Sequence, residues 1–313
     1  MATTNGSLRA LGSTGLHVFP LCLGGNVFGW TADEDSSFAV LDAYVAAGGN
    51  FIDTANGYSR WVPGHDGGES ERVIGAWLTK RGKRDDVIVA TKLGSDGGLT
   101  PENVRARAEE SLERLQSDHV DIMYAHYDDL DTPPEVSLAA LDELVKEGKV
   151  RHLAASNFTP ERLDEAIATS EREGFAKYEV LQPHYNLLER GYESTLEPVA
   201  ERRGLATAPY FGLAKGFLTG KYRPGHKVDS PRAAQIGDYE TDRGWAVLDA
   251  VEEVAAAHDV PAGAVALAWL AAQPTVVTPL ASARNTEQLA QILPMAGLEL
   301  SGDELEKLTE AGN

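Results

Sequence analysis

The 313-residue chain has a single cysteine, Cys22, and few basic residues for its size. One thiol cannot close an intrachain disulfide, and no cysteine pair has a zinc-binding spacing. The 28 Lys and Arg stand against 48 Asp and Glu, which gives a formal charge of −20 at pH 7. That charge repels nucleic-acid phosphates and anionic lipid headgroups, so we expect neither as a partner. No resident metal is expected either, because the sequence has no recognisable spacing of metal ligands. A reducing cytoplasm fits this composition best.

Long hydrophobic runs are also missing. The most apolar stretch, Ala262–Ala272, is shorter than the roughly 20 residues that a helix needs to cross a bilayer. The segment Met1–Ser7 is small and polar, without the pattern of a secretory signal. We therefore expect no membrane association, and the 42% of apolar residues suffices for a large core.

Short β-branched runs alternate with longer amphipathic segments along the chain. Eight runs are predicted to be strands: Val18–Gly24, Phe51–Thr54, Val87–Lys92, Val120–His126, Val150–Ser156, Tyr178–Gln182, Ala206–Tyr210 and Thr275–Leu280. The pattern predicts helices between the strands, before the last strand and after it: Asp33–Ala47, Gly68–Arg81, Pro101–Leu115, Pro134–Glu147, Pro160–Glu171, Leu196–Arg203, Asp242–His258, Pro261–Ala272 and Glu287–Leu293.

This alternation is typical of parallel sheets, either open and doubly wound or closed into a barrel. An open dinucleotide-binding sheet usually carries G-x-G-x-x-G after a strand, and the sequence has no such spacing. We therefore predict an α/β protein with one (β/α)8 TIM barrel domain over residues 1–313, since no linker or repeat divides the chain. Thr219–Tyr239 is predicted to be a long loop of the kind that often binds ligands.

Four ionisable residues follow three neighbouring strands. Asp53 lies at the end of the second strand and Tyr58 follows it, Lys92 ends the third, and His126 ends the fourth. In a barrel, the carboxyl ends of the strands converge on one face, where active sites are built. We therefore expect these four side chains to share one pocket.

These residue types suit acid catalysis on a carbonyl group. A phenol holds its proton at neutral pH, and a neighbouring ammonium would lower its pKa, so we expect Lys92 to lower the pKa of Tyr58. Asp53 would keep Lys92 protonated, and His126 would orient the substrate oxygen by a hydrogen bond. The set lacks a hydride source, which points to a nicotinamide cofactor.

Several motifs, in order, cover nearly the whole chain. They are Asp-Thr-Ala-x-x-Tyr, Ala-Thr-Lys, Ala-Ala-Ser-Asn-Phe, Leu-Gln-Pro-His-Tyr-Asn-Leu and Gly-Phe-Leu-Thr-Gly-Lys-Tyr, with a His ending the fourth strand. In these motifs the sequence resembles the aldo-keto reductase superfamily. The resemblance implies a barrel that binds NADP(H) across its C-terminal face and reduces aldehydes or ketones to alcohols. It implies that Tyr58 is the proton donor, Asp53 and Lys92 its modulating pair, and His126 the substrate-orienting residue.

The resemblance also implies a set of cofactor contacts. Ser156, Asn157 and Gln182 would meet the carboxamide, and Tyr210 the nicotinamide ring. The full set comprises Gly25, Asn26, Asp53, Ser156, Asn157, Gln182, Tyr210, Phe211, Gly212, Leu213, Lys215, Lys221, Arg232, Ser282, Arg284, Gln288 and Gln291.

The sequence departs from the family pattern in three places. Asn56 stands where an acidic residue is usual, Phe211-Gly212 replaces Ser-Pro, and Ile292 replaces an adenine-binding Asn. These changes touch the substrate mouth and the cofactor contacts rather than the four-residue catalytic set. The substrate mouth is expected to be aromatic, formed by Trp30, Tyr58, Trp61, His126 and Tyr127.

Two other functions remain open at this point. A nucleotide-binding regulatory subunit could use the same barrel, as the β-subunits of potassium channels do; by resemblance those carry Asn in place of His126. A hydrolase or isomerase could use Asp128, Asp129 and Asp131 as paired carboxylates or metal ligands, although their spacing is more typical of a solvated loop.

Overall fold

The computed structural model describes residues 6–225, 228 and 235–313. In this part of the chain, eight parallel strands form one sheet in the order β10-β3-β4-β5-β6-β7-β8-β9. The strands are β3 (Cys22–Gly24), β4 (Phe51–Asp53), β5 (Ile88–Leu93), β6 (Val120–Ala125), β7 (Val150–Ser156), β8 (Tyr178–Gln182), β9 (Ala206–Thr207) and β10 (Leu280–Ala281). A bridge between Thr207 and Val276 joins the two ends of the sheet. The predicted (β/α)8 barrel is confirmed.

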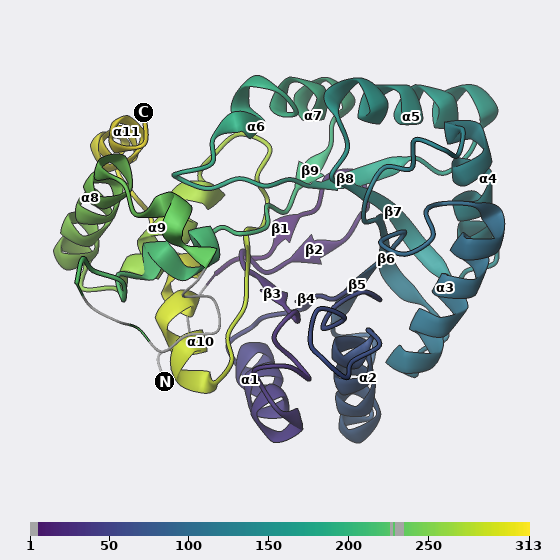
Figure 1. Cartoon of the computed structure of the whole chain (residues 1–313), viewed down its shortest axis with the longest axis horizontal. Coiled ribbons are helices and arrows are strands. Elements are labelled where there is room, and N and C mark those ends of the chain that lie inside the picture. The colour runs from purple at the N-terminus through teal and green to yellow at the C-terminus, as the bar shows by residue number, and fades with distance from the viewer. Residues whose placement is uncertain (1–5, 226–227, 229–234) are drawn as a thin grey trace.

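Helices surround the sheet in chain order, with α1 to α5 and α7 forming most of the ring (Figure 1). The α-helices are α1 (Glu34–Ala46), α2 (Glu69–Arg81), α3 (Pro101–Leu115), α4 (Pro134–Lys146), α5 (Pro160–Glu173), α6 (Gly191–Ser194), α7 (Glu197–Arg203), α8 (Asp242–His258), α9 (Ala262–Ala271), α10 (Thr286–Ile292) and α11 (Gly302–Ala311). Short 3-10 helices are η1 (Ala214–Thr219), η3 (Gly237–Tyr239) and η4 (Leu293–Gly297). Helices α6 and α11 were not predicted.

An N-terminal hairpin, which was also not predicted, closes one end of the barrel. Strands β1 (Arg9–Ala10) and β2 (His17–Val18) pair antiparallel and cross the middle of the ring in Figure 1. Leu11 and Val18 pack in one buried cluster with Phe51 and Ile88, which begin β4 and β5. The hairpin therefore covers the N-terminal ends of the strands, and the opposite end remains for a functional site.

Three predicted strands lose three or more of their expected residues, and a proline lies within each lost part. Proline has no amide hydrogen to donate to a ladder. Val18 belongs to the hairpin, and β3 begins only after Pro20. Strand β9 ends before Pro209, and β10 begins after Pro279. The Pro209 carbonyl nevertheless accepts a hydrogen bond of 2.9 Å from Leu280 N, which continues the barrel seam.

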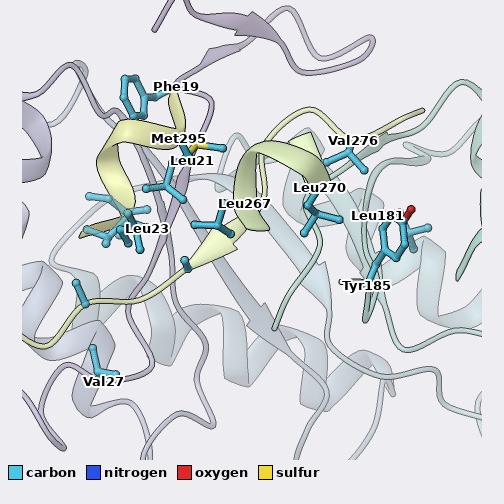
Figure 2. Close-up of a cluster of buried hydrophobic side chains, with 14 of the residues drawn as sticks. Phe19, Leu21, Leu23, Val27, Leu181, Tyr185, Leu267, Leu270, Val276 and Met295 are labelled. Atoms are coloured by element: carbon cyan, nitrogen blue, oxygen red, sulfur yellow. The ribbon is translucent and has the colours of Figure 1, made fainter. Parts of the chain in front are cut away.

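Helix α9 is strongly apolar, and nearly all of its side chains are buried in the core. Leu267 and Leu270 of α9 pack in the same cluster as Leu21 and Leu23 near β3, together with Met295 of η4 (Figure 2). No single helix in the described residues has the length and hydrophobicity to span a membrane, although α8 and α9, bent by 99°, meet those criteria together.

This packing predicts a large stability loss for Leu267→Ala. The side chain is fully buried, so truncation leaves a cavity and should lower the free energy of unfolding by about 2–5 kcal/mol. The matched control is Leu130→Ala, because Leu130 is 80% exposed and its truncation should cost no more than about 0.5 kcal/mol. Urea unfolding of both variants measures the difference. Equal losses would contradict the role assigned to α9.

Candidate active site

The period-two geometry of the strands brings the charged residues to the top of the barrel interior. Phe51 in β4 and Ile88 and Ala90 in β5 lie in the buried inner cluster. Alternate residues of a strand face the same side, so Asp53 and Lys92 continue these inward rows at the carboxyl ends. Both side chains are buried, at 0% and 1% exposure.

Asp53, Lys92 and Tyr58 form a closed triangle of hydrogen bonds. The Lys92 Nζ donates to Asp53 Oδ2 at 2.5 Å, to the Tyr58 hydroxyl at 2.8 Å and to the Thr54 carbonyl at 2.9 Å. The Tyr58 hydroxyl donates to Asp53 Oδ2 at 3.1 Å. The second carboxylate oxygen, Asp53 Oδ1, accepts from Gln182 Nε2 at 3.0 Å. Each ammonium proton of Lys92 therefore has an acceptor, and both carboxylate oxygens of Asp53 accept hydrogen bonds.

Burial controls the electrostatics of this triangle. It lowers the pKa of Lys92, and the Asp53 carboxylate opposes that effect. Burial also raises the pKa of Tyr58 well above its ordinary value, and Asp53 raises it further. The net pKa of Tyr58 is therefore raised in this state of the site, because burial and the Asp53 carboxylate outweigh the stabilisation of a phenolate that is expected from Lys92. Tyr58 holds its proton at neutral pH and above.

His126 lies beside Tyr58 in the same pocket. Their ring centroids are 6.2 Å apart at an interplanar angle of 77°, and the backbone nitrogen of His126 donates to the Leu93 carbonyl at 2.8 Å. Burial first, and then the Lys92 ammonium, lower the pKa of His126 from 6.5 to about 3. The imidazole is therefore neutral at pH 7 and retains one N–H to donate.

The triangle and His126 adjoin a cavity of about 740 Å³. The five residues predicted for the substrate mouth all line its wall. Trp30 meets Trp61 edge to face with centroids 5.5 Å apart, and His126 stacks on Tyr127 at 4.8 Å. Trp61 is 53% exposed and Tyr127 48%, so this aromatic end of the cavity is open to solvent.

A second set of polar groups lines the cavity wall and is joined to the triangle through Gln182 and Asp53. Tyr210 OH donates to Asn157 Oδ1 at 3.1 Å, and the Asn157 amide nitrogen donates to the Ser156 hydroxyl at 3.1 Å. The Ser156 hydroxyl in turn donates to the Gln182 carbonyl at 2.9 Å. Amide groups and an aromatic ring thus lie within one continuous network beside Asp53.

Most predicted cofactor contacts line the same cavity: Asn26, Ser156, Asn157, Gln182, Tyr210, Phe211, Gly212, Leu213, Lys215, Lys221, Ser282, Arg284, Gln288 and Gln291. Gly25 lies behind the wall, where its nitrogen donates to the Asp53 carbonyl at 2.7 Å. Arg232 lies outside the described residues. Three non-glycine residues of this wall, Asn157, Phe211 and Lys215, have φ between 55° and 57°. Left-handed residues of this kind tend to gather at functional sites.

Four wall residues with polar or charged side chains were missed from the sequence: Thr31, Arg60, Ser95 and Thr219. Arg60 follows Tyr58 by two positions, and Ser95 follows Lys92 by three, so proximity to the predicted site residues was an available signal. The loop carboxylates have other partners, because Asp128 accepts from Arg162 at 2.7 Å and Asp129 from Leu99 N at 2.7 Å. Among the described residues, no group of three or more His, Cys, Asp or Glu could hold a metal.

Comparison with known proteins agrees with this geometry. The sequence model described as "Aldo/keto reductase family" matches residues 20–313. The chain belongs to the aldo/keto reductase family. It is therefore an oxidoreductase, and members of this family generally use a nicotinamide cofactor.

Relatives of this aldo/keto reductase cover nearly its whole length. Aldo-keto reductase ausK of Aspergillus calidoustus is 32% identical, over 98% of this chain and 82% of its own. The uncharacterized oxidoreductase YrpG of Bacillus subtilis (strain 168) is 33% identical over 96% of this chain and 94% of its own. Norsolorinic acid reductase stcV of Emericella nidulans is 30% identical over 95% and 79%.

The environment of His126 predicts a pH dependence of stability in this aldo/keto reductase. The folded pKa of about 3 lies below the ordinary 6.5, so the unfolded chain binds more protons between these values. Stability should therefore fall as the pH falls from 6.5 toward 3, and His126→Gln should flatten this dependence. Urea unfolding at several pH values measures it. The control is His17→Gln, at an exposed site in β2, and an equal flattening there would contradict the prediction.

Proposed function

We propose that this chain is an NADP(H)-dependent reductase that converts aldehydes or ketones to alcohols. The observation that carries the proposal is the buried contact of Lys92 with both Asp53 and the Tyr58 hydroxyl at the wall of a large cavity. A neutral phenol held by an ammonium at 2.8 Å is a positioned general acid. The names of two relatives, aldo-keto reductase and norsolorinic acid reductase, agree with reduction as the reaction class.

The cavity fits a nicotinamide dinucleotide by its chemistry. Asn157, Ser156 and Gln182 offer amide and hydroxyl groups for a carboxamide, and Tyr210 offers a ring face. Lys221 and Arg284 line the same cavity and supply cations for phosphate groups. When bound, the reduced cofactor would supply a hydride to the substrate carbon.

The protein's own residues would handle the carbonyl oxygen. Tyr58 would donate its proton to that oxygen as negative charge develops there, because an alkoxide is a stronger base than a phenolate even when burial raises the phenol's pKa. Lys92 would stabilise the phenolate left behind across the 2.8 Å contact. Neutral His126, which lines the same cavity, would donate a hydrogen bond that directs the oxygen toward Tyr58.

A preference for NADPH over NADH follows from charge. NADH sites commonly use an acidic residue to bind the ribose 2′-hydroxyl, whereas NADPH sites use a basic residue for the 2′-phosphate. No Asp or Glu lines the cavity among the described residues, and Arg284 lines it beside Gln288 and Gln291.

We further propose that the chain acts as one domain in the cytoplasm. One buried cluster runs from Phe19 to Leu308, which supports the single domain.

Removing the phenol tests the proton donor. Tyr58→Phe should lower kcat for 4-nitrobenzaldehyde by about 10²- to 10⁴-fold, the usual contribution of a general acid, while nucleotide binding remains. Loss of NADPH absorbance measures turnover, and quenching of protein fluorescence measures binding. If the unaltered protein binds NADPH but shows no turnover above Tyr58→Phe with any aldehyde or ketone, the nucleotide-binding regulatory subunit becomes the better account.

Removing one cation tests the cofactor preference. Arg284→Ala should raise the KM for NADPH by about tenfold to hundredfold, the range expected when a charge-assisted hydrogen bond is lost, and change the KM for NADH far less. The control is Arg172→Ala on α5, whose guanidinium pairs with Glu173 outside the cavity. Equal effects on both cofactors would contradict a role for Arg284 at the 2′-phosphate.

A further inference from the structure

The cavity wall carries a charge opposite to that of the protein. The chain has a formal charge of −20, yet none of the described residues lining the cavity is an Asp or a Glu. Four basic residues line it: Arg60, Lys215, Lys221 and Arg284. The last three lie among the residues that we assign to the cofactor. Arg60 does not, and it therefore needs a separate explanation.

Arg60 belongs to the aromatic end of the cavity. It lies in the chain between Tyr58 and Trp61, which line the wall with it and whose ring centroids are 6.3 Å apart. The Ser95 hydroxyl, another wall group, donates to Asn56 Oδ1 at 3.2 Å. A guanidinium, a hydroxyl and indole rings thus surround the entrance through which a substrate carbonyl would reach Tyr58.

A row of ion pairs, in which basic and acidic side chains alternate, positions Arg60. Its Nη2 lies 3.3 Å from Asp96 Oδ2, and its Nε donates to the Asp66 carbonyl at 3.3 Å. Asp96 also pairs with Arg107 at 3.1 Å, so one carboxylate serves two guanidinium groups. The row of ion pairs then continues from Arg107 through Glu110 and Arg114 to Glu71, which is buried near the start of α2. Arg60, the cation at one end of this row, is the member that lines the cavity.

The pair with Asp96 leaves Arg60 able to bind a ligand. Arg60 and Asp96 are 38% and 47% exposed, and such pairs contribute about 0–1 kcal/mol because water screens them. A guanidinium carries five N–H groups, and the planar fork suits a carboxylate in bidentate contact. Aromatic walls beside it would hold a flat ring by its faces and edges.

From these observations we propose that the mouth contains a subsite for a carboxylate group, held by Arg60. The preferred substrates would be flat aldehydes or ketones that carry a carboxylate at the end of the ring away from the carbonyl. This inference rests on the proposed carbonyl reductase function and names its substrate class. The carboxylate lies on Arg60 and the ring against Trp61, while the carbonyl oxygen points to Tyr58.

Matched substrates test the charge preference. With the unaltered enzyme, kcat/KM should be at least about tenfold higher for 4-formylbenzoate than for methyl 4-formylbenzoate, because only the former can form a charge-assisted contact. Raising the salt concentration should reduce this ratio, since the mouth is open to solvent. A ratio near one, or a ratio insensitive to salt, would overturn the proposal.

Variants assign the preference to a residue. Arg60→Gln should lower the ratio by about tenfold to hundredfold, the range for a lost hydrogen bond to a charged group, and Arg60→Lys should keep part of it. Arg107→Gln is the matched control, because this change breaks the same row of ion pairs at Asp96, whereas Arg107 does not line the cavity. If Arg107→Gln lowers the ratio as much as Arg60→Gln, Arg60 only braces the loop and the subsite is refuted.

A binding measurement separates the subsite from the reaction. Terephthalate contains the ring and carboxylates but no aldehyde, and its binding can be followed by tryptophan fluorescence because Trp30 and Trp61 line the mouth. We expect it to bind more tightly than dimethyl terephthalate, and Arg60→Gln to remove the difference. Selective binding without turnover of any aldehyde would contradict the proposed function but support the subsite. Turnover of both aldehydes without selective binding of terephthalate would support the proposed function and contradict the subsite.

Discussion

The buried pair of Asp53 and Lys92 is the interaction on which the site depends. Two opposite charges at 0% and 1% exposure are costly to bury, and they persist in the barrel only because their hydrogen bonds are nearly all satisfied. Thr54, Tyr58 and Gln182 provide the remaining partners. The same requirement fixes the Tyr58 hydroxyl in place, so the condition for burying the charges also positions the acid.

The closed barrel supplies the rigid frame for that pair. Asp53 ends β4 and Lys92 lies near the end of β5, and these strands pair in parallel with Asp53 opposite Ala90. Residues two positions apart share the interior, so the Phe51 and Ile88 rows below are apolar and the top of each row is charged. The N-terminal hairpin closes the lower end, which leaves the cavity at the upper end as the place where small molecules can meet the charged residues.

Charge is distributed unevenly between the outer surface and the cavity. The chain as a whole is strongly acidic, whereas the cavity is lined by basic, amide and aromatic groups. Such a contrast favours the entry and retention of anionic ligands over others. Under the proposed function, the cofactor phosphates would bind the cations at one end of the cavity, and Arg60 would bind an anionic group at the other end, where Trp61 and Tyr127 are exposed.

The alternating apolar runs and the positions of Asp53, Tyr58, Lys92 and His126 were enough to predict the barrel and a shared site, because the strand period and the carboxyl-end rule are local properties. Other features depend on contacts between distant segments. The hairpin packs against the N-terminal ends of strands that come later in the chain. The raised pKa of Tyr58 arises from burial. Arg60 forms its ion pair with Asp96, which lies thirty-six positions away in the sequence. Burial and long-range ion pairs leave no periodic trace in the sequence, so only the tertiary structure decided them.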